Sequence, residues 1–358
     1  MKKLFKYLTY VFAVLLLNSC TSDDREVVIE TPPQGDYANG MFVLNEGGYT
    51  YSNASLSFVD QSGVVYNQSF SGVNGFGLGD VAQSMAFHND KAFIVVNNSN
   101  TIEVANRYTL EHITTISNQI LNPRYMVFYG DYGFVTNWGD PANTTDDYVA
   151  VIDLQNYSVI QTITVAEGPE KIIENNGILY VAHKGGWGYG NSISVINANT
   201  FQAANSITVA DVPDGLVVKD NYLYVLSAGK AAWTGDETVA GMFKINLQTN
   251  QVSDSFQFAS GVHPGFLEET NNELYFTLSG AIYKLATNNF TEPTTPVFST
   301  QNQNIEVLYG FEIHDNQIYI ADAKDYVSNG EVFVYDLQGN LQVNHQVQLI
   351  PNGFYFND

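Results

Sequence analysis

The sequence predicts an all-β protein, a seven-bladed β-propeller of four-stranded antiparallel blades. Three observations support this prediction: a strand motif recurs seven times, hairpin turn signals separate short apolar runs, and the two ends of the chain look like parts of one unit. A repeat of this length made of short β-type runs is typical of propellers.

Each repeat contains a short apolar run with an aromatic residue. The steps between consecutive aromatic residues are 51, 41, 46, 44, 51 and 44 residues. These seven residues are Phe42, Phe93, Phe134, Tyr180, Tyr224, Tyr275 and Tyr319.

The segment 169–209 shows the pattern of one unit most clearly. It has four apolar-polar alternating runs, at 169–173, 178–182, 192–196 and 206–209. Asn-Gly and similar turns separate them, as in antiparallel hairpins. We therefore expect an innermost, a second, a third and an outermost strand in each blade, in this order.

The two termini are expected to complete one blade together. The domain begins at Met41 on a second strand, and residues 351–356 read as an innermost strand with nothing after it. Pairing of these two segments would close the ring and remove the open sheet edges that a linear array leaves.

The N-terminal residues read as a signal and an anchor. Three lysines precede an apolar run, 8–17, that is too short to span a bilayer, as in a signal peptide of residues 1–19. The run ends in Leu17-Asn18-Ser19-Cys20, which resembles the lipobox of bacterial lipoproteins, with Cys20 as the lipidated residue. Residues 20–39 are expected to be a flexible acidic linker and 40–358 the propeller. A plain secretory peptide is the alternative.

Composition limits the choice of partners. The chain has a formal net charge of −23, and removal of the three N-terminal lysines makes it more negative. Such a surface repels nucleic acid and anionic lipid. We expect no nucleic-acid partner and contact with the membrane only through the lipid.

The two rims of the predicted ring differ in composition. Turns between strands one and two are short and polar, whereas loops between strands two and three contain glycine and aromatic residues. Exposed aromatic side chains suit stacking on a ligand. The ligand-binding candidates in these loops are Tyr49, Tyr51, Trp138, His183, Trp187, Tyr189, Trp233 and Tyr326. The alternative is that each tryptophan folds down to cap its own blade.

Polar residues follow the prolines that open several innermost strands. Arg124, Glu170, Asp214 and Asn352 are expected near the mouth of the central channel, where the first three are further ligand-binding candidates. Alternatively, these side chains hydrogen-bond neighbouring blades.

The sequence contains no recognised catalytic motif, and we predict no catalytic residue, no metal site and no cofactor. Zinc-protease, haem-attachment, serine-hydrolase and P-loop spacings do not occur. One loop contains Asp140, Asn143, Asp146 and Asp147, whose oxygens could hold calcium. A solvated acidic loop is the alternative for this segment.

Taken together, these motifs resemble YVTN-type seven-bladed propellers, through strand cores such as 179–182 and 194–197. The series Leu44-Asn45-Glu46-Gly47, Pro123-Arg124-Tyr125, Thr136-Asn137-Trp138 and Gly168-Pro169-Glu170 is similar to surface propeller lipoproteins of Bacteroidota. The acidic residues after Cys20 resemble the surface-export signal of that group. Some members capture corrinoids such as vitamin B12 and pass them to a TonB-dependent outer-membrane transporter.

The resemblance implies a non-catalytic ligand-capture lipoprotein on the cell surface, anchored in the outer membrane. A corrinoid is the expected ligand and a TonB-dependent transporter the expected partner. Three alternatives remain open: a propeller that binds other proteins, one that binds glycans, and a propeller enzyme.

Overall fold

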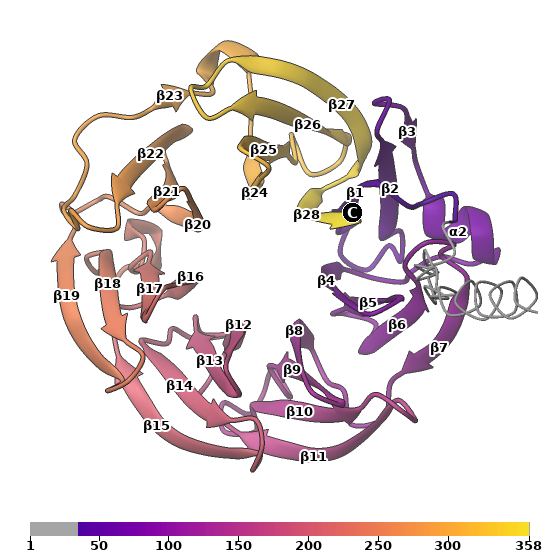
Figure 1. Cartoon of the computed structure of the whole chain (residues 1–358), viewed down its shortest axis with the longest axis horizontal. Coiled ribbons are helices and arrows are strands. Elements are labelled where there is room, and N and C mark those ends of the chain that lie inside the picture. Colours follow the sequence, from indigo (N-terminus) through magenta and orange to yellow (C-terminus); the bar gives the residue numbers. More distant parts are fainter. Residues whose placement is uncertain (1–34, 358) are drawn as a thin grey trace, which may run out of the picture. The chain divides into compact units, whose positions relative to one another are not determined.

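The computed structural model describes residues 35–357, and the strands in it form seven separate four-stranded sheets arranged in a ring (Figure 1). All strand pairs are antiparallel. The prediction of a seven-bladed propeller is therefore confirmed. We number the blades I to VII in chain order and give their strands from the channel outward.

The strands of the first four blades are as follows. Blade I contains β28 (Pro351–Asn357), β1 (Gly40–Asn45), β2 (Ser55–Asp60) and β3 (Val65–Tyr66). Blade II contains β4 (Ala82–His88), β5 (Lys91–Val96), β6 (Thr101–Asn106) and β7 (His112–Ile116). Blade III contains β8 (Pro123–Tyr129), β9 (Tyr132–Asn137), β10 (Tyr148–Asp153) and β11 (Ser158–Thr164). Blade IV contains β12 (Pro169–Asn175), β13 (Ile178–His183), β14 (Ser192–Asn197) and β15 (Gln202–Thr208).

The remaining blades follow the same order. Blade V contains β16 (Pro213–Lys219), β17 (Tyr222–Ser227), β18 (Gly241–Asn246) and β19 (Gln251–Gln257). Blade VI contains β20 (Gly265–Thr270), β21 (Glu273–Leu278), β22 (Ala281–Ala286) and β23 (Phe298–Ser299). Blade VII contains β24 (Leu308–His314), β25 (Gln317–Asp322), β26 (Asn329–Asp336) and β27 (Leu341–Leu349).

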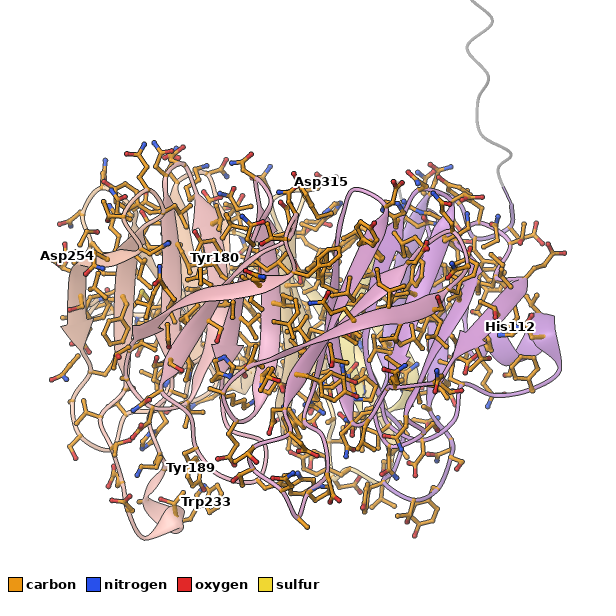
Figure 2. The ribbon with its side chains drawn as sticks, turned by 90° about the horizontal axis from the view of Figure 1, so that it is seen from below. His112, Tyr180, Tyr189, Trp233, Asp254 and Asp315 are labelled. Atoms are coloured by element: carbon orange, nitrogen blue, oxygen red, sulfur yellow. The ribbon has the colours of Figure 1, made fainter. Side chains whose placement is uncertain are left out.

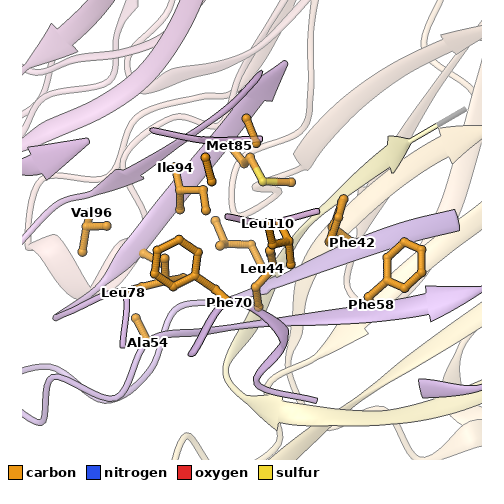
Figure 3. Packing of buried hydrophobic residues seen from close by; sticks show 14 residues of the cluster. Phe42, Leu44, Ala54, Phe58, Phe70, Leu78, Met85, Ile94, Val96 and Leu110 are labelled. Atoms are coloured by element: carbon orange, nitrogen blue, oxygen red, sulfur yellow. The ribbon is translucent and has the colours of Figure 1, made fainter. Parts of the chain in front are cut away.

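The hydrophobic core lies between adjacent blades. Second and third strands are buried along most of their length because a neighbouring sheet covers each face. Figure 3 shows the cluster between blades I and II, where Phe42 and Leu44 pack with Met85 and Ile94. Phe42 has no exposed surface, and burial of such a side chain contributes about 2 kcal/mol. The recurring aromatic residues of the sequence are thus packing residues.

The C-terminal strand closes the ring as predicted. β28 pairs with β1 in an antiparallel register that places Phe42 opposite Tyr355, so the first and last strands belong to one sheet. The side-chain amide of Asn357 donates to the carbonyls of Tyr37 and Arg107 at 2.6 and 2.9 Å. These bonds fix the end of the chain to blade II.

The start of the domain differs from the expected boundary. Tyr37, which the sequence places in the linker, packs on Phe42 and Phe58 and donates its backbone N–H to Tyr108. Residues 35–39 are therefore part of the packed domain. The predicted signal peptide, Cys20 and the rest of the linker lie outside the described residues.

In the described part of the chain, three short helices interrupt the β structure. They are α2 (Ser69–Asn74) and two 3₁₀ turns, Ala232–Thr234 and Gln301–Gln303. α2 buries Ser69 and Phe70 beside β2, where the outermost strand of blade I has only two residues. Within residues 35–357, no helix has the length and hydropathy needed to cross a membrane.

Candidate functional site

The two rims of the ring carry different side chains. Figure 2 shows Tyr189 and Trp233 on one rim and Asp315, from the turn between β24 and β25, on the other. We call the rim with Tyr189 and Trp233 the aromatic rim and the other the polar rim. In a four-stranded antiparallel blade, the connections between blades lie on the same rim as the loops between strands two and three, which here is the aromatic rim. Every innermost strand follows such a connection and therefore begins at the aromatic rim.

A β-bulge near the start of each innermost strand turns one side chain out of the regular alternation of the strand. In all seven blades the pairing of the innermost strand shifts by one residue at this point. Bulges of this kind redirect a side chain out of the regular alternation. The seven residues at these positions all line one cavity, and we call them the mouth ring: Gln83, Arg124, Glu170, Asp214, Phe266, Tyr309 and Asn352.

The cavity occupies the channel at the aromatic rim and has a volume of about 430 Å³. Ligand pockets in proteins commonly have volumes of 300 to 1,000 Å³. Its wall also includes Glu46 and Lys184 from the loops that follow second strands. The cavity therefore opens among the aromatic loops.

Two ion pairs join blades at the mouth. Arg124 donates from Nε and Nη2 to the two carboxylate oxygens of Glu170, at 2.9 and 2.8 Å. Lys184 donates from Nζ to Asp214 at 2.8 Å. Arg124, Glu170 and Asp214 thus lie at the mouth as expected and also bond to neighbouring blades, while their role in ligand binding stays a prediction. Asn352 likewise donates to the carbonyl of Ala82 at 2.9 Å.

The first aromatic group lies on blades III to V. The rings of Trp138 and Trp187 meet edge to face with centroids 6.1 Å apart. In the loop of Trp187, the ring of Tyr189 lies 5.9 Å from Nζ of Lys230, which belongs to the loop of Trp233. All three predicted tryptophans are therefore on loops of consecutive blades at the same rim.

The three tryptophans differ in what they leave exposed. Trp187 is 59% exposed and Trp233 is 84% exposed, so neither indole caps its own blade. Trp138 is half-buried, and the guanidinium of Arg124 lies 4.0 Å from its ring centroid. This cation-π contact covers part of Trp138 and holds it in position. Trp187 and Trp233 offer most of the free indole surface.

The second aromatic group lies on blades VII and I, on the other side of the mouth. Tyr49 and Tyr51 are well exposed on the loop between β1 and β2. Tyr326 meets the mouth-ring residue Tyr309 edge to face at 5.6 Å. Burial and the nearby carboxylate of Glu46 raise the pKa of Tyr309, which keeps its hydroxyl protonated.

His183 does not belong to the aromatic rim surface, which corrects its place among the ligand-binding candidates. It is the last residue of β13, is completely buried, and bonds through Nε2 to Ser194 Oγ at 2.8 Å. Equivalent positions in other blades hold the buried Asn45, Asn137 and Asp322. Asn137 and Asp322 accept from backbone N–H groups of inter-blade connections, and Asn45 accepts from that of Gln348 in β27. Position in the blade thus explains the burial of His183.

The acidic loop after β9 uses its carboxylates to order its own backbone. Asp146 accepts from the backbone N–H of Asp140, and Asp147 accepts from that of Gly168 at 2.9 Å. Burial raises the pKa of Asp147 to about 6, assisted by the charges of Asp146 and Glu167. Throughout residues 35–357, no group of three or more His, Cys, Asp or Glu side chains is placed to hold a metal ion.

Sequence reasoning found four of the seven mouth-ring residues. Arg124, Glu170, Asp214 and Asn352 follow a proline, which was the only marker of these positions. Gln83, Phe266 and Tyr309 follow alanine, glycine and leucine, so that marker was missing. The charged channel residues below the ring, Lys171, Glu268 and Glu312, were also missed. These three stand one, two and three positions after the mouth-ring residues of their own strands, so no fixed spacing in the sequence marks them.

Similarity to solved structures supports the architecture. A quinonprotein alcohol dehydrogenase-like protein from Bacteroides thetaiotaomicron superposes with a TM-score of 0.68 at 14% identity, covering 90% of this chain and 79% of that one. A functionally unknown protein from Desulfotomaculum acetoxidans gives a TM-score of 0.63 at 10% identity, with coverages of 89% and 99%. The computationally designed Ika8 protein gives 0.58 at 12%, with 90% and 92%. These identities establish a shared fold alone.

Comparison with models of protein families assigns the sequence to a family. No curated protein matches the chain. The model described as "Domain of unknown function (DUF5074)" matches residues 39–357, which is nearly the whole propeller. The chain therefore belongs to the DUF5074 family.

Proposed function

We propose that this protein is a non-catalytic ligand-capture protein whose aromatic rim binds a broad, flat ligand across the mouth of the channel. The observation that supports this most is the presence of exposed aromatic side chains on both sides of one charged cavity. Trp187 and Trp233 lie on rim loops of blades IV and V, and Tyr49, Tyr51 and Tyr326 on rim loops of blades I and VII, outside the lining of the cavity itself. Large exposed aromatic surfaces of this kind commonly mark binding sites.

A corrinoid is the ligand class that we favour. Its macrocycle is wide, flat and bordered by amide groups, so indole and phenol rings would contact its faces while polar groups contact its edge. A cavity of about 430 Å³ accommodates only part of so large a molecule. The ring would therefore lie on the rim above the mouth.

The direct test is a calorimetric titration of the purified chain with cyanocobalamin. We expect saturable binding at micromolar ligand or below. The double substitution Trp187→Ala with Trp233→Ala should weaken binding at least about tenfold, a loss of about 1.4 kcal/mol. Because both indoles are exposed, the unfolding midpoint should stay nearly the same.

Tyr66→Ala is the matched control, since Tyr66 is a half-exposed aromatic residue on β3, the outermost strand of blade I, and not in a loop of the aromatic rim. It should leave the affinity unchanged. Absence of heat at micromolar cyanocobalamin would remove the corrinoid assignment. Equal affinity of the double variant and the unaltered chain would remove the aromatic rim as the binding surface.

We further propose that Cys20 anchors the protein in the outer membrane on the cell surface, beside a TonB-dependent transporter. The lipobox-like sequence and the acidic residues after it support this proposal. Cys20→Ser should move the protein from the membrane fraction to the soluble fraction. External protease should degrade the anchored form on intact cells, and protection from it would contradict the cell-surface location. A transporter should co-purify with the protein, and its absence would contradict the proposed partner.

One observation favours an enzyme as the second candidate. Glu268 and Glu312, on the innermost strands β20 and β24, hydrogen-bond to each other within the channel, and both have raised pKa values because of burial. Glycosidases need their two carboxyl groups at least about 5 Å apart, so a directly bonded pair does not suit that reaction. Turnover of any substrate that is lost in Glu312→Gln would favour this candidate over capture.

A further inference from the structure

A second cavity lies at the polar rim, where blades I and VII meet. Its volume is about 320 Å³, and Asp315, which Figure 2 shows on this rim, is part of its wall. It shares no lining residue with the cavity at the mouth, so a ligand here would not depend on one at the aromatic rim. We call it the seam cavity and define it by residues of these two blades: Met41, Val59, Asp60, Asp315, His345 and Phe356.

One part of the seam cavity is an apolar wall. Met41 and Val59 belong to the core cluster between blades I and VII, and each is only 6% exposed. The ring of Phe356 stacks on that of His314, with centroids 3.8 Å apart and planes at 6°. The ring of Tyr319 meets Phe356 edge to face at 4.9 Å. These contacts fix the wall in position, so it is ready to receive an apolar group.

The charged groups of the seam cavity are acidic. Among the described residues that line it are two aspartates and neither lysine nor arginine. Asp60 accepts through Oδ1 from the backbone N–H groups of Ser62 and Val64, both at 2.9 Å. Within residues 35–357, its Oδ2 has one bond, 3.3 Å from the hydroxyl of Tyr66. The turn therefore holds the carboxylate while one oxygen retains capacity to accept.

His345 is a buried polar side chain in the same wall. It lies on β27, is 9% exposed, and forms no hydrogen bond or ion pair with any other described residue. Burial lowers the pKa of its ring, which is therefore neutral at neutral pH and has one acceptor nitrogen. A Cβ atom added to Gly63, in the turn of Asp60, would lie 3.7 Å from Cε1 of His345. Buried polar groups normally have a partner, so this corner of the cavity has bonding capacity for a ligand.

We propose that the seam cavity binds a small primary amine with an aromatic body, of the arylalkylamine class. The aromatic body would pack on Met41 and Phe356, since aromatic rings favour edge-to-face contacts with one another. The ammonium group has three N–H donors, which Asp60 and His345 would accept. An anion would meet two carboxylates, and the formal net charge of −23 attracts cations to the protein. The volume is at the lower end of the range for ligand pockets, which favours a small molecule.

Three probes with the same phenyl group separate the charge classes at neutral pH: 2-phenylethylamine is a cation, 2-phenylethanol is neutral, and phenylacetate is an anion. Ligand-observed NMR titration of the full chain should show about millimolar binding of 2-phenylethylamine. 2-Phenylethanol should bind about fivefold more weakly because it lacks the charge, and phenylacetate at least about tenfold more weakly because the aspartates repel it. Asp60→Asn removes a charge and His345→Leu removes an acceptor, so each should weaken amine binding by about fivefold.

Asp153→Asn is the matched control, because Asp153 ends β10 of blade III as Asp60 ends β2, and it likewise accepts from a backbone N–H of the turn that follows. It should leave amine binding unchanged. If phenylacetate binds best, the cavity is an anion site; if 2-phenylethanol binds as tightly as the amine, the aspartates have no role; either result overturns the proposal. So does absence of binding, or amine binding that both cavity variants retain. Should His345→Leu fail to fold, the three probes on the unaltered chain and Asp60→Asn still decide.

Discussion

Arg124 connects Glu170 with Trp138, and this arrangement links the channel to the aromatic rim. Its guanidinium makes two hydrogen bonds, 2.9 and 2.8 Å long, to the carboxylate of Glu170 on the next blade, and lies 4.0 Å from the centroid of the Trp138 ring. Trp138 in turn contacts Trp187. An ion pair between two innermost strands therefore helps to position the indoles of two loops.

Glu170→Gln should destabilise the protein strongly. The pair is buried, with side-chain exposures of 11% for Arg124 and 2% for Glu170, and loss of one partner leaves a charge without compensation. We expect the free energy of unfolding in denaturant to fall by about 3 kcal/mol. The control Glu273→Gln breaks the partly exposed pair with Lys284 and should cost less than about 1 kcal/mol. Similar losses in both variants would show that the Arg124 pair has no special role.

Gly168→Ala tests the close packing under the loop of Trp187. Gly168 has φ +64°, and a Cβ atom there would lie 2.1 to 2.3 Å from backbone atoms of Gly185 and Gly186. We expect a loss of about 3 kcal/mol or more in the free energy of unfolding, because backbone must move to relieve the overlap.

Gly130→Ala is the matched control for Gly168→Ala. Gly130 has a similar φ of +58°, but nothing lies within 4 Å of its added Cβ. It should cost only about 1 kcal/mol, the conformational penalty of a left-handed residue with a side chain. Thermal and denaturant unfolding of both variants would measure the difference, and equal losses would contradict the packing argument.

The sequence was sufficient to predict the fold because the same physical requirement recurs in each blade. A second strand covered on both faces must be apolar throughout, as in Leu179–Ala182, and each hairpin needs a turn residue that tolerates a positive φ, as at Asn176. Closure of the ring could be predicted because the N-terminal and C-terminal segments are each an incomplete blade and together make one complete blade. None of these features depends on contacts that are distant in the chain.

The candidate site was predicted only in part because it depends on distant contacts. Trp187 and Trp233 could be found from loop composition alone. Glu268 and Glu312 are 44 positions apart and meet only because the ring brings two innermost strands together. His183 was predicted to contact a ligand because it was counted as part of the aromatic loop that contains Trp187. It is instead the last residue of the second strand β13 and is buried, so that prediction was wrong.

Asp147→Asn should change how stability depends on pH. Burial raises the pKa of Asp147 from 3.8 to about 6 in the folded protein. Between these two values the folded state binds a proton that the unfolded state has lost, so this group lowers the free energy of unfolding as pH rises from about 4 to 6. Asparagine has no such titration and can still accept from the N–H of Gly168. The variant should therefore gain in melting temperature relative to the unaltered chain above pH 6.

Differential scanning calorimetry from pH 4 to 8 would measure that gain. Asp140→Asn is the control, because Asp140 is an exposed carboxylate in the same loop. Its melting curve should follow that of the unaltered chain across this range. A difference between Asp147→Asn and the unaltered chain that stays constant with pH would contradict the assigned titration.

Asn357→Ala should weaken the closure of the ring. Asn357 is completely buried; its amide donates to the carbonyls of Tyr37 and Arg107, and its oxygen accepts from Nε of Arg107. Alanine would leave those carbonyls and the guanidinium with fewer partners, at a cost of about 2 to 3 kcal/mol. Hydrogen exchange should become faster in β28 and β1 than in β13 and β14, because the closing sheet is the one that opens. The exposed Asn344→Ala should change stability by less than about 0.5 kcal/mol. Uniform acceleration in all blades would mean that the ring unfolds as one unit, with no weak point at its closure.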